Sequence, residues 1–82
     1  MRLDKFLKVS RIIKRRTVAN DACDASHVSV NGRPAKASYD VKVGDEIAVS
    51  FGARTLRVRV LSVKEVVKKE DAAGLYESVS EG

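Results

Sequence analysis

The first quarter of the chain places its apolar residues at the spacing of short helices. Within residues 3–9, Leu3, Phe6 and Leu7 share one side of a helix with 3.6 residues per turn, and basic side chains occupy the opposite side. This pattern predicts a helix that buries one face and exposes a basic one.

Residues 16–25 predict a second helix with small apolar side chains on one face and acidic character on the other. The apolar face consists of Val18, Ala19, Ala22, Cys23 and Ala25, and the polar face of Asn20, Asp21 and Asp24. Small side chains allow close packing against a neighbour. The acidic flank is expected to repel phosphate.

From residue 28 onward, apolar residues recur at every second position, which is the spacing of strands. Val28 and Val30 lead into Asn31-Gly32, a pair that favours a two-residue hairpin because both residues tolerate a positive φ. Pro34 lacks the N–H that a central strand needs, so the returning arm is predicted to be an edge or irregular.

Two longer alternating segments follow, each preceded by a turn. The turns are predicted at Val43-Gly44-Asp45 and Gly52-Ala53, and the apolar positions are Ile47, Val49, Phe51, Leu56, Val58 and Val60. The chain is therefore predicted to be a single α+β domain in which two short N-terminal helices pack on a small, mostly antiparallel sheet.

The last part of the chain is charged and only weakly apolar. We expect residues 1–63 to form the domain and residues 64–82 to form a tail. The segment EDAAGLY is compatible with one helical turn, anchored to the core by Leu75 or Tyr76. The final SVSEG is expected to be loose.

The positive charge is concentrated near the N-terminus. The chain has 82 residues, enough for one domain, and a net charge of +5 at pH 7. Residues 1–16 contain a single acid, Asp4, and seven bases: Arg2, Lys5, Lys8, Arg11, Lys14, Arg15 and Arg16. A local basic field of this kind indicates a polyanionic partner, most often nucleic acid.

Other classes of function find little support in the sequence. One cysteine, Cys23, and one histidine, His27, provide neither an internal disulfide nor a metal site, and Cys23 is expected in the core. No catalytic or cofactor-binding arrangement is present. No apolar run approaches the ~18 residues of a membrane span, and no signal peptide is visible. We therefore expect a cytoplasmic monomer without enzymatic activity, cofactor or membrane contact.

Three consecutive bases, Lys14, Arg15 and Arg16, stand where the second helix begins. Free N–H groups and the helix dipole favour anions there, so each base in the first turn is unfavourable by roughly 0.3–1 kcal/mol at low salt. A phosphate beside the helix start explains this arrangement; the alternative is that the long side chains extend into water. Arg16 is the strongest single candidate, followed by Arg2.

Aromatic residues are scarce, and Phe6 and Phe51 lie on apolar faces where we expect them in the core. The sequence therefore lacks the aromatic side chains on which unpaired bases usually stack. Recognition is expected to depend mainly on phosphates and shape. Whether the face of the sheet that carries Arg57 and Arg59 also binds nucleic acid stays open.

Four segments follow one another at a familiar spacing: RLDKFL at 2–7, RRTVANDAC at 15–23, HVSVNGRPAKASYDV at 27–41 and VGDEIAV at 43–49. Together they resemble the S-four domain, the RNA-binding module named after the fourth small-subunit ribosomal protein. The resemblance implies an RNA-binding face formed by Arg2, Lys5, Arg11, Lys14, Arg15, Arg16, Thr17, Lys36 and Ser38. The charge pattern alone does not indicate Lys36 or Ser38.

The pattern of the whole chain, with IIKRRT, NGRPAKAS and KKEDAA, resembles free-standing members of this family that act in ribosome-associated quality control. The resemblance implies binding to a large ribosomal subunit with a stalled peptidyl-tRNA, through large-subunit rRNA and the tRNA. It also implies support for C-terminal alanine tailing of the stalled nascent chain by an RqcH-like tailing factor on the ribosome.

Three other functions stay open. The fifteen-kilodalton heat-shock protein, a rescue factor for large subunits bearing nascent chains, shares the S-four domain but carries a longer basic C-terminal extension. The others are a protein-interaction domain and a detached RNA-binding part of an RNA-modifying enzyme.

The sequence departs from the family pattern at both ends of the second helix. Many members have Ser-Arg at its start where this chain has Arg15-Arg16, so either Arg15 or Thr17 caps the helix. Glycine usually follows the helix. Ser26 occupies that place here, although a left-handed backbone costs serine more than glycine.

Overall fold

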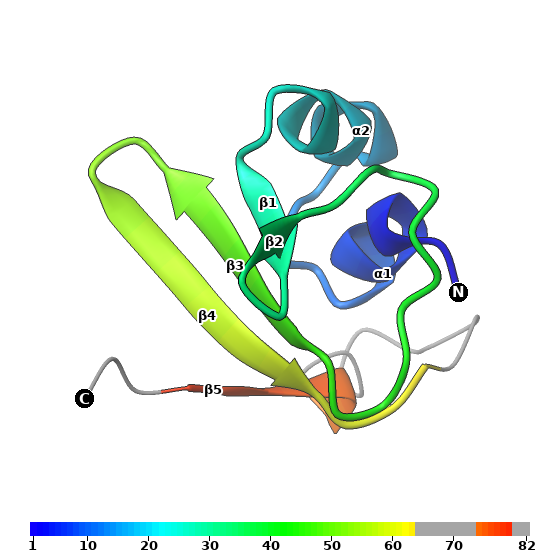
Figure 1. Cartoon of the computed structure of the whole chain (residues 1–82). Helices are drawn as coiled ribbons and strands as arrows, with labels where there is room; N and C mark the ends of the chain where they lie inside the picture. Colours follow the sequence, from blue (N-terminus) through cyan, green and yellow to red (C-terminus); the bar gives the residue numbers. More distant parts are fainter. Residues whose placement is uncertain (64–73, 80–82) are drawn as a thin grey trace.

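The computed structural model describes residues 1–63 and 74–79 of the chain. Two helices are followed by the strands of a sheet (Figure 1). The bounds are Leu3–Val9 for α1, Arg16–Asp24 for α2, Val28–Val30 for β1, Arg33–Pro34 for β2, Glu46–Phe51 for β3, Arg54–Val60 for β4 and Tyr76–Ser78 for β5. Both predicted helices are present, and α2 ends within one residue of its predicted end.

The strands form an antiparallel sheet with the spatial order β2-β1-β3-β4-β5. Figure 1 shows both helices on the same side of this sheet, with the β3–β4 hairpin extending past them. The predicted α+β architecture is confirmed, and Pro34 lies in the edge strand β2. Within residues 1–63 and 74–79, no helix is long and apolar enough to cross a membrane.

The hydrophobic core lies between the helices and the sheet. Leu3, Phe6 and Leu7 of α1 are fully buried, as their spacing predicts. The strand residues in the same cluster are Val28, Val30, Ile47, Val49, Val58 and Val60. A helix of seven residues is too short to be stable alone. Packing of its apolar face, at about 1.5–3 kcal/mol for each large side chain, therefore holds α1 in place.

Three apolar residues that the pattern assigns to the core are exposed. Val18 and Phe51 are 49% and 46% exposed, and Ala25 also faces solvent. The core prediction for these residues is wrong. The buried residues of α2 are Ala19 and Cys23, which form a narrow line beside Val18. Phe51 is the last residue of β3, in the part of the hairpin that extends past the helices (Figure 1).

The Asn31-Gly32 hairpin forms as predicted. Both residues have a positive φ, 53° and 83°, which matches the twist of the flanking strands. The side chain of Asn31 accepts the N–H of Glu46 at 3.1 Å and donates to Oδ1 of Asp45 at 3.2 Å. The hairpin tip is thereby attached to the start of β3.

Residues 74–79 join the sheet. Leu75 is 2% exposed and anchors this segment in the core, as predicted, and Tyr76–Ser78 pairs with β4. The expectation of a loose end is wrong for Ser78 and Val79. Ser78 is paired in the sheet, and the N–H of Val79 donates to a carbonyl of β4 at 2.9 Å. Most of the predicted helical turn, and the chain after Val79, lie outside the described residues.

The end of α2 places a serine in the left-handed region. Ser26 has a φ of 61°. Its N–H donates to the carbonyl of Cys23 at 3.0 Å, and the N–H of His27 donates to the carbonyl of Ala22 at 2.9 Å. These bonds form a Schellman motif, in which glycine usually holds the left-handed position.

Ser26→Gly is expected to stabilise the protein by about 0.5–1 kcal/mol, because the left-handed penalty that glycine avoids exceeds its extra entropy in the unfolded chain. The midpoint of urea unfolding measures this change. Ala25→Gly is the matched control: Ala25 has a φ of −84°, so glycine there should lower the midpoint. A lower midpoint for Ser26→Gly would contradict the argument from backbone strain.

Candidate nucleic-acid interface

A buried carboxylate joins the two helices near their N-termini. Asp4 lies in the first turn of α1, and its side chain is 3% exposed. Its Oδ1 accepts a hydrogen bond from Nε of Arg2 at 3.2 Å, and its Oδ2 accepts one from Nε of Arg16 at 3.3 Å. The backbone N–H of Lys5 donates to Oδ1 at 2.8 Å. One acidic side chain therefore orients the two arginines that the sequence ranks highest.

The pKa of Asp4 lies below its ordinary value as the net result of opposing effects. Burial is the largest effect and by itself raises the pKa, because it disfavours the charged form. Hydrogen bonds from Arg2, Arg16 and the N–H of Lys5, with the charge of Arg16, together lower the pKa by more than burial raises it. Asp4 is therefore ionised at neutral pH and matched by two cations.

Each arginine keeps part of its guanidinium group available for a second partner. Arg16 contacts Asp4 through Nε, which leaves its two terminal nitrogens side by side. Arg2 contacts Asp4 through Nε and, at 3.5 Å, through Nη2. The side chains of Arg2 and Arg16 are 51% and 45% exposed. Because two adjacent guanidinium nitrogens can bind two phosphate oxygens, Arg16 retains a complete edge for an anion.

At the N-terminus of α1, the first backbone amides already donate hydrogen bonds within the protein and are not free to bind an anion. The N–H of Leu3 donates to the carbonyl of Tyr39 at 2.8 Å, and the N–H of Asp4 donates to the carbonyl of Ala37 at 3.2 Å. The N–H of Lys5 is taken by the Asp4 side chain. The first turn of α1 is therefore closed by the chain itself and is not an anion site.

The N-terminus of α2 is open. Its N-cap residue is Arg15, with an extended backbone (φ −118°, ψ 132°) and no capping bond from its side chain. Arg15 rather than Thr17 thus holds the cap position that the sequence left undecided. Among the described residues, the N–H groups of residues 16–18 have no hydrogen-bond partner. Three open amides therefore lie at the helix start that carries Arg16, and an anion is favoured there.

Several of the other predicted residues lie next to this helix start or close to α1. Lys14, Arg15 and Thr17 are exposed beside Arg16. Lys36 and Ser38 are exposed on residues 35–39, the segment whose carbonyls close the first turn of α1. The fold thus brings residues 35–39 against the start of α1, and Lys36 also lies beside Asp24 and Ser26 at the end of α2.

The remaining predicted residues are farther away or less accessible. Lys8 is exposed in the last turn of α1, roughly 9 Å along the helix axis from Arg2. Arg11 is exposed just beyond it, with a left-handed φ of 61°. Lys5 is half-buried. These three residues lie at the margin of the face that Arg2 and Arg16 define.

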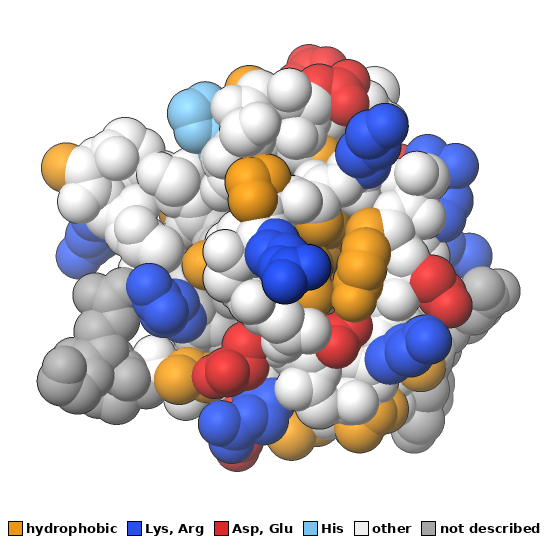
Figure 2. Space-filling model, viewed as in Figure 1, with side chains coloured by type: hydrophobic (Ala, Val, Ile, Leu, Met, Phe, Trp, Pro, Cys, Tyr) orange, Lys and Arg blue, Asp and Glu red, His pale blue; other side chains and the backbone are white. Residues whose placement is uncertain are grey.

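Acidic side chains limit this face on one side. Asp21 and Asp24 are exposed on α2, as the helical pattern predicts. Figure 2 shows acidic side chains gathered over α2 at the top of the molecule and basic ones along the right-hand edge beside the helices. The basic face is therefore restricted to the start of α2 and its surroundings.

The sheet carries a basic residue whose charge is already matched. Arg59 of β4 contacts Glu77 of β5 at 3.0 Å and Glu46 of β3 at 3.7 Å. These two ion pairs link three neighbouring strands across the exposed face. Arg59 therefore stabilises the pairing of the strands. This favours the interpretation that the exposed face of the sheet is a solvated surface.

Cys23 is a core residue rather than a reactive thiol. Its side chain is buried against α1, and burial, aided by the charges of Asp4 and Asp24, raises the pKa of the thiol to about 11. At neutral pH the thiolate, which is the reactive form, is therefore scarce.

Asp4 is the residue of the candidate site that reasoning from the sequence missed. It is the only acid among residues 1–16, and its helical position lies about 60° from that of Leu7, at the border of the buried face. An acid at such a border, surrounded by bases, is a signal for a buried ion pair. The pattern alone does not say which bases it binds.

Two helices on a small antiparallel sheet, with a basic face at the helix starts, are the arrangement that the S-four resemblance implies. The sequence model of this family, the S4 domain, matches residues 1–47. The chain belongs to the S4 domain family, so the prediction from the four sequence segments is confirmed.

Relatives that match over nearly their whole length show to which group within the S4 domain family the chain belongs. The chain is 58% identical over 81 residues to the RQC P-site tRNA stabilizing factor of Streptococcus pneumoniae (strain ATCC BAA-255 / R6), covering 99% of this chain and 92% of the relative. It is 54% identical over 81 residues to the Bacillus subtilis (strain 168) protein of the same name, covering 99% and 94%. Within the S4 domain family, the chain thus belongs with the RQC P-site tRNA stabilizing factors.

A solved structure shares the fold. Heat Shock Protein 15 of Vibrio cholerae superposes with a TM-score of 0.90 at 27% sequence identity, covering 99% of this chain and 83% of that chain. The arrangement of helices and strands described above is therefore common to at least two kinds of S4 domain protein.

Asp4→Asn is expected to lower the free energy of unfolding at pH 7 by about 1–3 kcal/mol, because it removes charge-assisted hydrogen bonds at a buried site. The folded state holds the pKa of Asp4 below its ordinary value. The carboxylate therefore stabilises the protein above about pH 4, and this contribution is lost as the pH falls through the folded-state pKa. Urea unfolding between pH 7 and pH 2.5 measures the difference.

The variant should accordingly approach the wild type in stability at the acid end of this range. Asp24→Asn, which changes an exposed acid on α2, is the matched control and should shift the free energy by less than about 0.5 kcal/mol. A constant difference between Asp4→Asn and wild type at every pH would contradict the role of the Asp4 charge.

Proposed function

We propose that this chain binds the large ribosomal subunit carrying a stalled peptidyl-tRNA and stabilises that tRNA in the P site during ribosome-associated quality control. The observation that carries this proposal is the 58% identity, over nearly the whole of both chains, to a factor named for that role. The protein acts by binding RNA in the cytoplasm and has no catalytic activity of its own.

The basic face supports this role by binding phosphates of large-subunit rRNA and of the tRNA. The proposed contacts are Arg2, Lys5, Lys8, Arg11, Lys14, Arg15, Arg16, Thr17, Lys36 and Ser38. Asp4 holds Arg2 and Arg16 before RNA arrives, and this reduces the rotamer entropy, about 2 kcal/mol for a free arginine, that binding removes. We expect Arg16 and the open amides of α2 to bind the same phosphate.

Stabilising the tRNA supports the addition of alanine to the stalled chain. A peptidyl-tRNA held in the P site keeps its nascent chain positioned for transfer. The proposed partner in that reaction is an RqcH-like tailing factor on the same subunit. The chain itself contributes to the affinity of the subunit for the peptidyl-tRNA and to the orientation of that tRNA.

A second candidate function is the rescue of large subunits in the manner of the heat-shock protein. The TM-score of 0.90 to Heat Shock Protein 15 favours it, because the same fold can present the same basic face. The two functions differ in whether the chain changes the yield of alanine tailing.

Binding to large subunits is expected to weaken steeply with salt, and Arg16→Ala should weaken it further. With about four phosphate contacts, affinity falls roughly 100-fold between 50 mM and 200 mM salt. At fixed salt, loss of the Arg16 contact weakens binding about 10-fold or more, since hydrogen bonds to charged groups contribute about 1.5–3 kcal/mol. Cosedimentation with purified subunits across a salt series measures both effects.

The matched control is Arg54→Ala, which removes one charge at the far end of the β3–β4 hairpin and should change affinity by less than about threefold. Because Arg16 also contacts Asp4, Arg16→Ala should lower the melting temperature slightly, by up to about 5 °C. Equal losses of affinity in both variants, or a flat response to salt, would contradict the proposed face.

The chain should bind large subunits that carry a peptidyl-tRNA more tightly than empty subunits, because the tRNA supplies part of the contact. In a reconstituted tailing reaction with an RqcH-like factor, omitting the chain should reduce the alanine added to the stalled peptide. Equal affinity for empty subunits, with tailing unaffected, would favour the second candidate. Peptidyl-tRNA dependence without an effect on tailing would remove only the alanine-tailing part of the proposal.

A further inference from the structure

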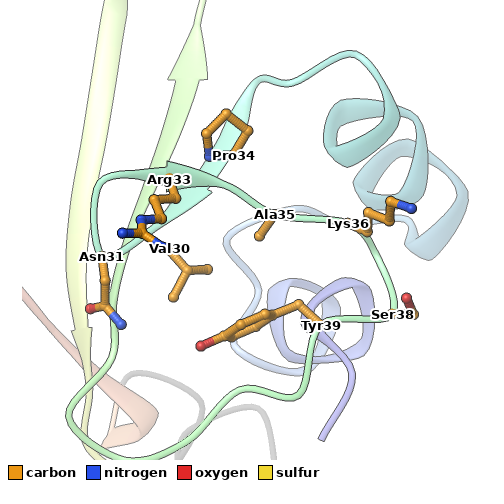
Figure 3. Close-up of a pocket in the computed structure, with 8 residues that line it drawn as sticks. All are labelled: Val30, Asn31, Arg33, Pro34, Ala35, Lys36, Ser38 and Tyr39. Atoms are coloured by element: carbon orange, nitrogen blue, oxygen red, sulfur yellow. The ribbon is translucent and has the colours of Figure 1, made fainter.

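A cleft separates the β1–β2 hairpin from the segment that follows it (Figure 3). Its volume is about 700 Å³, within the range of pockets that hold small ligands, roughly 300–1,000 Å³. One side is lined by the hairpin residues Val30, Asn31, Arg33 and Pro34, and the other by Ala35, Lys36, Ser38 and Tyr39.

An aromatic ring lies across this cleft. Figure 3 shows the side chain of Tyr39 extending from its loop toward the hairpin, close to Val30 and Ala35. Val30 is 4% exposed and forms an apolar floor, whereas Tyr39 is 36% exposed. The cleft thus offers an accessible aromatic surface beside apolar side chains, which is the environment that a flat aromatic ligand requires.

The Tyr39 ring is held in position by Asp45. The hydroxyl of Tyr39 donates to Oδ2 of Asp45 at 3.3 Å. The same carboxylate accepts the N–H of Lys42 at 3.0 Å and Nδ2 of Asn31 at 3.2 Å. Because Asp45 is itself attached to the turn and to the hairpin, the ring is oriented before a ligand arrives.

Two cations flank the cleft. Figure 3 shows Arg33 on the hairpin side and Lys36 on the opposite side, with their charged ends directed away from each other at the two rims of the cleft. Within the part of the chain that the structure describes, neither has an ion-pair partner, and the acid nearest the cleft, Asp45, is bonded to the Tyr39 hydroxyl and to Asn31 at its edge. Figure 2 shows apolar surface next to a basic side chain near the centre of this side of the molecule. The charge therefore favours an anionic ligand with an aromatic part.

The cleft adjoins the basic face. The carbonyls of Ala37 and Tyr39 accept the first amides of α1, at 3.2 Å and 2.8 Å, so the cleft wall and the start of α1 are one connected unit. Arg2 and Asp4 lie at that helix start. The wall of the cleft is therefore joined directly to the helix start that carries Arg2.

We propose that this cleft holds one unpaired nucleotide of the bound RNA, with its base stacked on Tyr39 and its phosphate at the rim beside Arg33. This inference rests on the proposed function in taking RNA as the partner, and it adds a base-binding subsite to a face described so far through phosphates. Stacking tolerates any base, because every base has an aromatic face, so the subsite selects an unpaired nucleotide rather than a sequence.

The test compares single-stranded with paired RNA. Fluorescence anisotropy measures binding of labelled hexaadenylate, which offers unpaired bases, and of a fully paired RNA hairpin. Tyr39→Leu should weaken hexaadenylate binding about 10-fold, since loss of one stacked base weakens binding by roughly 5-fold to 150-fold. It should leave the hairpin unaffected. Tyr39→Phe keeps the ring and should stay within about threefold of wild type.

Arg33→Ala should also weaken hexaadenylate binding, and Lys42→Ala, whose side chain does not line the cleft, is the matched control for charge. Urea unfolding of each variant establishes that it is folded. Hexaglutamate and adenosine monophosphate are competitors: the first carries similar charge without bases, and the second is a single free nucleotide. Neither should displace hexaadenylate at equal concentration.

The outcomes separate the two proposals. If neither RNA binds, the proposed function fails, and the cleft proposal fails with it. If the hairpin binds through Arg16 but hexaadenylate binding is unchanged by Tyr39→Leu, only the cleft proposal is overturned. Displacement by hexaglutamate would mean that the cleft binds acidic peptides, and displacement by adenosine monophosphate that it takes free nucleotides. Either result overturns the assignment to an RNA strand.

Discussion

The contact of Asp4 with Arg2 and Arg16 is the constraint on which the basic face depends. A buried carboxylate without donors is costly, so the fold must keep its hydrogen-bond partners in place. Arg16 is twelve residues away in sequence and lies on the other helix, so the contact fixes the start of α2 against the first turn of α1. Because buried Asp4 needs hydrogen-bond donors, it fixes the orientation of two arginines at the surface.

The segment 35–39 is the second structural link, because it serves both the helices and the hairpin. Its carbonyls occupy the amides at the start of α1, and this leaves the start of α2 as the one of the two helix N-termini with open amides in the described chain. Its side chains, with Tyr39 held by Asp45, form a wall of the cleft beside β1 and β2. The basic face and the proposed base-binding cleft are thus built on the same backbone connections.

The residues whose positions were predicted wrongly share one cause. Val18 and Phe51 lie at apolar positions of a correct helix and a correct strand, yet both are exposed because the neighbouring element does not reach them. Tyr39 has no periodic pattern around it, and its place beside the hairpin follows from long-range contacts. Spacing identifies a face of an element, and only packing determines how much of that face is covered.

The sequence by itself determined both helices, the strands from residue 28 to 60, the Asn31-Gly32 turn and the concentration of positive charge at the N-terminus, because each depends on residues close together in the chain. It also pointed to Arg16 and Arg2 through the excess of bases where α2 begins. Only the tertiary structure decided that Asp4 binds both arginines, that α2 rather than α1 has open amides, and that Tyr39 lies against the hairpin. Those features join residues far apart in sequence, and their energies depend on distances and burial that no local pattern specifies.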